Sequence, residues 1–359
     1  MTSFRQISVG VLAPAAVLAC MSVGVGPSLG ASSRAPASEG AVKIDTGQAE
    51  AVLQVLRQRQ AGSVPDASWG ALWQTRGFAQ FEQRQQSFGA KDVRGKMRAF
   101  LMSDAPLADL ATLEAAITRW RGLDAAAAAA RALAYLPAGT ELGATIYPVI
   151  KSARNSFVYD LDGDPAIFMH VNGKRSAADI EDTLAHELHH VGSVQGCGDP
   201  PDRDRLTPGA RDALDWMSGF GEGLAMLAAA GGPDVHPHAG SKAAAWVVWE
   251  RDVARFNEDV RRLEAFFLDL LEGRLDEDAQ RQAGFEFINT DEVPQGAFYT
   301  VGWKMAALVE RQLGRGRVIA AVCDPRLLLE AYDEVAATQP RGDGGGLQRW
   351  SPELLERLR

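Results

Sequence analysis

Residues 176–190 read Ser-Ala-Ala-Asp-Ile-Glu-Asp-Thr-Leu-Ala-His-Glu-Leu-His-His, and this stretch decides the fold. A strand-like run precedes it, and Ser176 followed three residues later by Asp179 is a typical beginning of a helix. The helix carries the pattern H-E-x-x-H, with His186 and His190 as its histidines. Residues i and i+4 of a helix lie on one face, so both imidazoles can reach one metal ion.

The pattern predicts a zinc site, because zinc accepts imidazole nitrogen readily and needs no redox cycle. Glu187 lies beside the first histidine, where it can take a proton from the attacking water. The chain has only six histidines, so this pattern rarely arises by chance in 359 residues. We predict His186 and His190 as Zn²⁺ ligands and Glu187 as the catalytic general base. The alternative is a helix with three histidines and no metal.

A catalytic zinc ion needs a third protein ligand and an open fourth position. The metzincin pattern is excluded, because Gly192 stands one place early and Gly196 cannot bind through a side chain. Glu222 lies in a second helical stretch, over about residues 208–230, among small and apolar neighbours. A carboxylate in such surroundings is costly unless it is paired or binds a metal. We predict Glu222 as the third ligand, on a helix that small residues bring close to the first; a capping or solvated Glu is the alternative.

With these residues the chain resembles the gluzincin metallopeptidases, which carry H-E-x-x-H on one helix and a Glu ligand on the next. More narrowly, it is similar to bacterial families of zinc-dependent peptidases that are known mainly from sequence. The matching segments are residues 185–190, 221–225 and 299–305, and the resemblance is specific over about residues 145–310. It implies a mainly α fold of the α+β class, a zincin-like helical domain with a small β-sheet whose edge strand lines the active-site cleft.

The mechanism needs two further groups, a donor to the oxyanion and a carboxylate that orients the first histidine. Tyr299 begins a helix in an aromatic and Gly-rich stretch, and its phenol is a candidate donor to the oxyanion of the reaction; a core Tyr is the alternative. Gluzincins place an Asp four residues after the ligand Glu to orient the first histidine, and Met226 stands there instead. The orienting carboxylate must then come from elsewhere, and we expect it among three unranked candidates: Asp182, Asp215 and Glu250.

The other histidines are expected to have ordinary roles. His189 lies about 100° round the helix from His190, so we expect it to pack or to support a ligand from behind rather than to bind zinc. His170 lies on a candidate edge strand and is more simply a strand residue than a substrate contact. His236 and His238 lie in a Gly-Pro loop and are expected to be solvated.

The remaining pattern is mostly helical, with one β signal. Strand-like runs over residues 155–161 and 166–171 flank the turn-forming residues 162–165, and we expect an extended substrate to pair with the backbone of 166–171. Apolar residues spaced 4,3,4,3 predict one long core-facing helix over 241–272. Further helices are predicted over residues 51–61, 107–120, 124–135 and 297–313.

The beginning of the chain resembles an export signal. Residues 1–31 combine a positive start, an apolar stretch and a small-residue tail, which predicts a signal peptide; a retained membrane anchor is the alternative. Cys20 ends a lipobox-like Val-Leu-Ala-Cys, and the second interpretation is therefore a lipoprotein signal over residues 1–19. A lipidated Cys20 would tether the protein to a membrane. Residues 32–42 are predicted as a flexible tether, 43–150 as an N-terminal helical region and 151–359 as the zincin-like region, in one continuous globule.

The composition of the chain bears on the class of partner that it binds and on its disulfide chemistry. The net charge is −9, with 37 Lys and Arg against 46 Asp and Glu, and no basic run occurs, which argues against nucleic-acid binding. Cys197 and Cys323 either form one disulfide, as exported proteins allow, or remain separate thiols.

Together these features predict an exported zinc metallopeptidase, periplasmic, outer-membrane-tethered or secreted, that acts on a peptide or protein. One alternative is a zinc-dependent amide or ester hydrolase acting on cell-wall or other non-protein material, because the same ligands support that chemistry. The other is a catalytically silent binding lipoprotein. The intact Glu187 argues against the silent protein, because loss of that residue is the simplest route to an inactive site.

Overall fold

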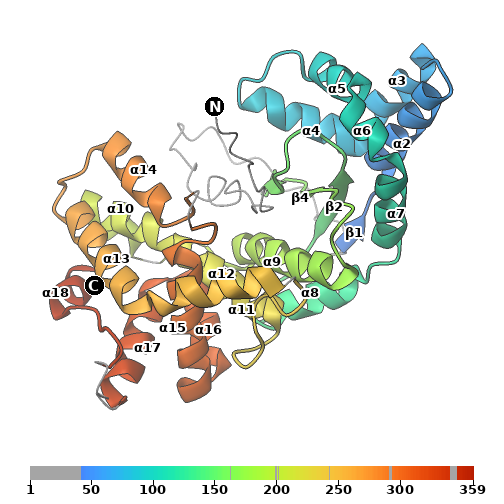
Figure 1. The fold of residues 1–359 in the computed structure, drawn as a ribbon. Coiled ribbons are helices and arrows are strands. Elements are labelled where there is room, and N and C mark those ends of the chain that lie inside the picture. Colours follow the sequence, from blue (N-terminus) through green and yellow to red (C-terminus); the bar gives the residue numbers. More distant parts are fainter. Residues whose placement is uncertain are drawn as a thin grey trace, which may run out of the picture.

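The computed structural model describes residues 42–161, 163–198, 200, 202–241, 243–290, 293–339 and 346–359. This part is mainly helical with one small sheet, so the predicted mainly α, α+β class is confirmed (Figure 1). The predicted signal peptide, Cys20 and the tether up to residue 41 lie outside the described residues. Among the described helices, none is long and apolar enough to cross a membrane.

The sheet has the strand order β1-β2-β4-β3. Strands β1 (Val42–Ile44), β2 (Ala144–Val149) and β4 (Ala166–His170) are parallel, and β3 (Phe157–Tyr159) is antiparallel to β4. Strands β1 and β2 were not predicted. Pro148 in β2 lies beyond the end of β1, which pairs only with residues 144–146, so its missing N–H costs no bond to β1. The sheet joins strands from both sides of residue 150.

The prediction that residues 166–171 form the edge strand is wrong. Strand β4 lies inside the sheet, with β2 on one side and β3 on the other. Residues 166–168 pair with β3 on one side and residues 166–170 pair with β2 on the other, so a substrate cannot pair with the whole of 166–171. The outer strand on this side is β3, and it contacts the helix that carries H-E-x-x-H. The hairpin pattern could not decide which of its two strands lies outermost, because this depends on the distant pairing with β2.

The two faces of the sheet are covered by different helices. On one face Tyr147, Phe157 and Phe168 pack with Phe81 of α4 (Arg76–Ser87). On the other face Ile167 and its neighbours pack against the apolar side of α9 (Ala177–Gly196), which lies beside α8 (Ala125–Leu133). Alternate residues of a strand point to opposite faces, which accounts for this division. The N-terminal helices complete this half: α2 (Gly47–Gln60), α3 (Asp66–Gln74), α5 (Val93–Met102), α6 (Asp104–Ala108) and α7 (Leu110–Arg121).

The second half of the described chain is helical and packs against α9 through α11 (Gly221–Ala230). Its longest described helix is α15 (Ala297–Leu313), which has the predicted bounds. The other elements are η1 (Arg203–Arg205), α10 (Pro208–Met217), η2 (Ser218–Phe220), α12 (Ala243–Ala254), α13 (Phe256–Leu271), α14 (Glu277–Glu286), α16 (Arg315–Cys323), α17 (Arg326–Thr338) and α18 (Pro352–Arg357).

Several predicted helices are interrupted. The single helix expected over 241–272 is wrong, because the chain turns at Arg255 between α12 and α13. The apolar spacing continues through this break, so the core-facing stripe was recognised while the break was not. A 3₁₀ turn separates α10 from α11, and Asp109 separates α6 from α7. Helices α2 and α8 match the predictions over 51–61 and 124–135 within a few residues.

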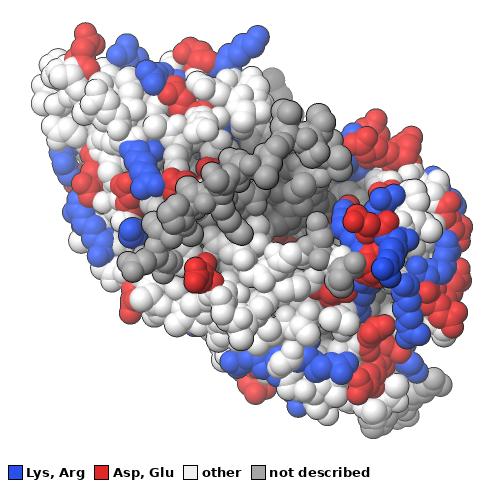
Figure 2. Space-filling model, turned by 180° about the vertical axis from the view of Figure 1, so that it is seen from behind, with Lys and Arg blue, Asp and Glu red and all other residues white. Residues whose placement is uncertain are grey.

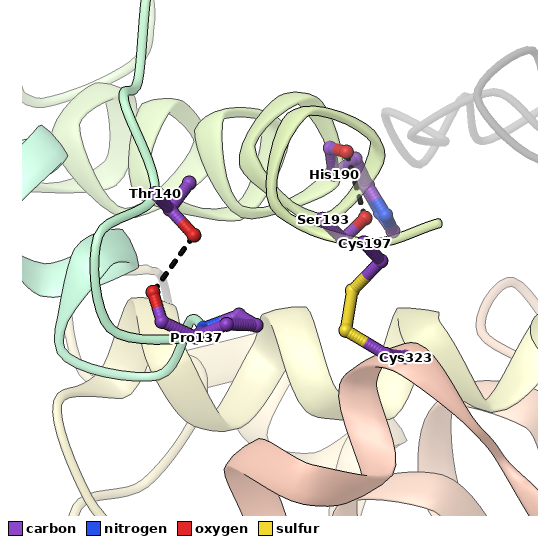
Figure 3. The surroundings of a disulfide bond; sticks show 6 residues. All are labelled: Pro137, Thr140, His190, Ser193, Cys197 and Cys323. Atoms are coloured by element: carbon purple, nitrogen blue, oxygen red, sulfur yellow. Dashed lines mark hydrogen bonds between the residues drawn. A yellow bond between two sulfur atoms is a disulfide. The ribbon is translucent and has the colours of Figure 1, made fainter. Parts of the chain in front are cut away.

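A disulfide joins Cys197 and Cys323, which decides between the two alternatives left open by the sequence (Figure 3). Cys197 directly follows α9 and Cys323 is the last residue of α16, so the bond fastens the end of α9 to the second half of the chain. The Cys197 N–H also donates to the Ser193 carbonyl, and the Ser193 hydroxyl donates to the His190 carbonyl. The bond therefore anchors the turns that follow the second histidine.

The outer surface carries both signs of charge. Figure 2 shows acidic and basic side chains interspersed on one face of the described residues. Many of them form ion pairs, such as Arg203 with Asp215 and Arg349 with Asp333. Exposed pairs of this kind contribute about 0–1 kcal/mol each to stability, so the fold rests on its cores rather than on these charges.

Candidate metal centre

The helix α9 is built as its sequence predicts. The Asp179 N–H donates to the Ser176 hydroxyl at 3.0 Å, which caps the first turn. Leu184 and Leu188 are fully buried and hold the helix against the sheet. His186 and His190 consequently emerge on the side that faces α11.

Three atoms from α9 and α11 converge at one point. His186 Nε2 lies 3.0 Å from His190 Nε2 and 3.0 Å from Glu222 Oε2, and His190 Nε2 lies 3.3 Å from the same carboxylate oxygen. Atoms that bind one tetrahedral zinc ion at about 2.0–2.1 Å stand about 3.3 Å apart. The three side chains therefore fit one zinc ion, and they form the one group of this kind among the described residues.

Glu222 is deeply buried, with 2% of its surface exposed. Burial alone would raise the pKa of its carboxyl group, but the positive charges of His190 and His186 outweigh burial and hold that pKa below its usual range. A buried carboxylate is stable here only because these partners compensate its charge. Such compensation is also what a metal ion would provide.

Glu187 lies beside the ligand atoms but is not part of the converging group. Its side chain is buried, and its Oε2 atom has no hydrogen-bond partner among the described residues. Burial raises the pKa of this carboxyl group, against the opposing charges of His186 and His190. An unpartnered buried carboxylate beside a possible metal site is available to exchange a proton with a reactant.

Tyr299, on the first turn of α15, also reaches this centre. Its ring lies parallel to that of His186, with 6.2 Å between the ring centroids. Burial, followed by the nearby Glu222 carboxylate, raises the pKa of the phenol well above its ordinary value, so the hydroxyl stays protonated. The structure thus brings together all five residues that the sequence singled out.

Two glycines allow α15 to approach α11 so closely. A Cβ atom on Gly223 would lie 2.1 Å from the main-chain nitrogen of Trp303 and 2.6 Å from the Cα of Gly302. The sequence led us to expect that the small residues around Glu222 serve contact with α9. Gly223 instead serves contact with α15, the helix that carries Tyr299.

The three candidates for the orienting carboxylate are engaged elsewhere. Asp182 pairs with Arg131, Asp215 with Arg203, and Glu250 with His236. The position that gluzincins give to an Asp is taken by Met226, whose sulfur accepts a hydrogen bond from Gln295. In the described part of the chain, His186 Nδ1 is buried without a partner.

One residue near Glu187 was not predicted. The Arg175 guanidinium donates to the Asp179 carboxylate at 2.7 Å and to the Thr183 hydroxyl. Thr183 lies one turn before Glu187 on the same side of α9. Its positive charge lowers the pKa of Glu187, against the larger effect of burial. The spacing of 175, 179, 183 and 187 by four residues is a signal that could have revealed this arrangement.

The other histidines lie outside the converging group. His189 is buried in the core side of α9, as expected. His236 and His238 are not solvated: His236 stacks on Trp246, and His238 lies 2.7 Å from Gln295 Oε1. The loop that carries them is therefore packed rather than free, which the Gly-Pro composition did not reveal.

The comparison with known protein families agrees with a possible zinc site. The family model described as "Putative zinc dependent peptidase (DUF5700)" matches residues 106–341, about two thirds of the chain, and the chain belongs to this family. All five residues of the centre fall within the matched segment. No curated protein and no solved structure matches the chain.

Proposed function

We propose that this protein is an exported zinc metallopeptidase of the gluzincin type. His186, His190 and Glu222 hold Zn²⁺, Glu187 is the general base and Tyr299 is the oxyanion donor. The observation that carries this proposal is the convergence of two imidazoles and one carboxylate within 3.3 Å, with an unpartnered buried carboxylate next to them. Membership of the family described as "Putative zinc dependent peptidase" supports the proposed function as well.

When bound, zinc supplies Lewis-acid polarisation of the scissile carbonyl and lowers the pKa of the attacking water to about 7. Glu187 accepts the proton of that water through its free Oε2 atom and passes it to the leaving amine. Tyr299 remains protonated because its pKa is raised, and it donates a hydrogen bond to the developing oxyanion. An extended peptide pairs with the outer edge of β3, which is the last strand of the described sheet and contacts α9.

A disulfide bond among the described residues supports export. A disulfide between Cys197 and Cys323 persists in an oxidising compartment and is rare in a reducing one. The export signal predicted over residues 1–31 agrees with this, and a lipidated Cys20 would place the enzyme at a membrane surface.

The test is hydrolysis of casein and of muropeptides by wild type, by Glu187→Gln and by Glu181→Gln, a matched change elsewhere on α9. We expect zinc-dependent cleavage of casein that falls by roughly 10²- to 10⁴-fold in Glu187→Gln and is unchanged in Glu181→Gln. Cleavage of muropeptides alone would instead favour the amide hydrolase. Absence of turnover on both, in folded and zinc-loaded protein, would favour the silent binding protein.

A further inference from the structure

Basic side chains gather where β2 and β4 end and β3 begins. Lys151 follows β2, Arg154 lies in the segment leading into β3, and His170 is the last residue of β4. Arg84 reaches the same place from α4, with its guanidinium 3.6 Å from the centre of the Phe157 ring. We call Arg84, Lys151, Arg154 and His170 the basic cluster.

Among the described residues, the cations of the basic cluster have no counter-ion at ion-pair distance. Lys151 is only 4% exposed, and its Nζ donates to two neutral oxygens, the Ala153 carbonyl at 2.6 Å and Asn155 Oδ1 at 2.7 Å. Within the described residues, no carboxylate lies at ion-pair distance from Arg84, Lys151 or Arg154, although the chain carries 46 acidic residues. A buried cation without a counter-ion is costly, so an anion that arrives here is strongly favoured.

His170 adds a neutral hydrogen-bonding group. Its Nδ1 atom is buried and has no partner among the described residues. Burial, with the positive charges of Lys151 and Arg154, lowers the pKa of the imidazole to about 4. The ring is therefore neutral at pH 7 and offers one N–H donor beside the cations.

Arg175 lies between the end of β4 and the beginning of α9, and it is held by Asp179 and Thr183 of that helix. Thr183 lies one helical turn before Glu187 on the same side of α9. Strand β3, along which the proposed substrate lies, pairs with β4 and contacts α9.

The sheet geometry offers the cluster to a substrate. Arg84 and Lys151 both lie near the ring of Phe157, which packs on the face of the sheet that α4 covers, opposite to α9. In an extended peptide paired with β3, neighbouring side chains point to opposite faces of the sheet. When one side chain faces α9, the next one faces the basic cluster.

We propose that the basic cluster binds a carboxylate of the substrate, either an acidic side chain near the cleaved bond or a free C-terminal carboxylate. The guanidinium fork of Arg84 or Arg154 matches a carboxylate, and Lys151 and His170 supply further donors. This inference rests on the proposed peptidase function. A different explanation is that these cations only protect the outer strand from pairing with other chains, in which case substrate choice does not depend on them.

The experiment compares internally quenched peptides that differ only in Glu or Gln, placed at each position in turn around the cleaved bond, with both termini blocked. A second pair differs only in a free or amidated C-terminus. Zinc-loaded wild type is compared with Arg154→Gln, with Lys151→Met, and with the matched control Lys96→Gln, an exposed Lys on α5. We expect kcat/KM for one Glu peptide, or for the free C-terminus, to exceed that of its neutral twin by about 10-fold or more.

In Arg154→Gln and Lys151→Met the ratio of kcat/KM for the acidic peptide to kcat/KM for its neutral twin should shrink to about 2-fold or less. Lys96→Gln should keep the full preference. Equal cleavage of acidic and neutral peptides by wild type would overturn the proposal, as would a preference that survives both substitutions. Because Arg154 is exposed, its variant tests the proposal even if Lys151→Met fails to fold.

Binding of the same peptides to zinc-loaded Glu187→Gln, measured by fluorescence anisotropy, separates the two proposals. If wild type cleaves no peptide but Glu187→Gln binds the acidic twin about 10-fold more tightly, the carboxylate subsite stands and the peptidase proposal fails. If peptides are cleaved without any acidic preference, the peptidase proposal stands and the subsite fails. If no peptide is bound or cleaved, both are wrong.

Discussion

Alanine at position 223 should both destabilise the protein and disturb the metal centre. A Cβ there would lie 2.1 Å from the Trp303 main-chain nitrogen and 2.3 Å from the main-chain carbon of Gly302, about 1.3 Å short of ordinary contact at 3.4 Å. These are backbone atoms and cannot rotate away, so α11 and α15 must separate. Overpacking of this kind costs about 1–3 kcal/mol, and the gain in helix propensity returns about 0.5–1 kcal/mol. We expect a net loss of about 1 kcal/mol in the free energy of unfolding, with an upper limit of about 2.5 kcal/mol.

The assay is urea unfolding of wild type, Gly223→Ala and the control Gly221→Ala, together with zinc content. Gly221 lies on the same helix, and a Cβ there meets nothing within 4 Å, so Gly221→Ala should be neutral or more stable by up to about 1 kcal/mol. Gly223→Ala should also retain less zinc, because separation of the helices displaces Glu222. Equal stability of the two variants would refute the close packing of α11 and α15 on which the site depends.

Three further changes test other parts of the account. Tyr299→Phe should lower kcat by roughly 10²-fold with little change in KM, because a protonated phenol near the reacting carbonyl is lost. Zinc analysis of this variant should show full occupancy. An unchanged kcat would remove Tyr299 from the mechanism. For the double variant Cys197→Ser/Cys323→Ser, urea unfolding should show a free energy of unfolding about 2–5 kcal/mol lower than that of wild type, because the disulfide closes a long loop. If the variant and wild type are equally stable under oxidising conditions, the disulfide is not formed. Burial lowers the pKa of Lys151 from 10.5 to about 7, so the unfolded chain binds more protons above pH 7 and wild-type stability should rise there. Unfolding titrations should show that the free energy of unfolding of wild type, relative to that of Lys151→Met, rises by about 2 kcal/mol between pH 7 and pH 9. If the difference in stability between the two proteins does not change with pH, Lys151 is not a buried, uncompensated ammonium.

The local features of the site were predictable from the sequence. The cap at Ser176, the helix after it and the i, i+4 histidines depend on residues within a few positions of each other. Glu222 was found because a lone carboxylate among small and apolar residues needs a partner, and the structure places His186 and His190 beside it.

The sheet was predicted less well, because its order depends on distant pairing. Strand β1 pairs with β2 about a hundred residues later, and β1 is too short to show a pattern of its own. The run 144–149 holds β-branched and aromatic residues, but Pro148 within it weakens the pattern that is typical of a strand inside a sheet. Without β2, nothing in the hairpin indicated that 166–170 lies inside the sheet and that β3 is its edge.

The helix break at Arg255 was hidden for a different reason. The apolar residues of α12 and α13 keep their spacing across the turn, so the periodicity reports which side faces the core and not whether the backbone is continuous. Arg255 is neither Gly nor Pro, and the sequence carries no breaker at this point. The loop histidines were misjudged because their partners, Trp246 and Gln295, come from other segments.

The central claim is that His186, His190 and Glu222 hold one zinc ion. The most direct measurement is zinc per chain in protein purified without added metal, comparing wild type with Glu222→Ala and with Glu181→Ala as the matched change. The account predicts about one zinc per chain in wild type and in Glu181→Ala, and clear loss in a folded Glu222→Ala. Equal zinc in all three proteins, or none in folded wild type after incubation with Zn²⁺, would contradict it.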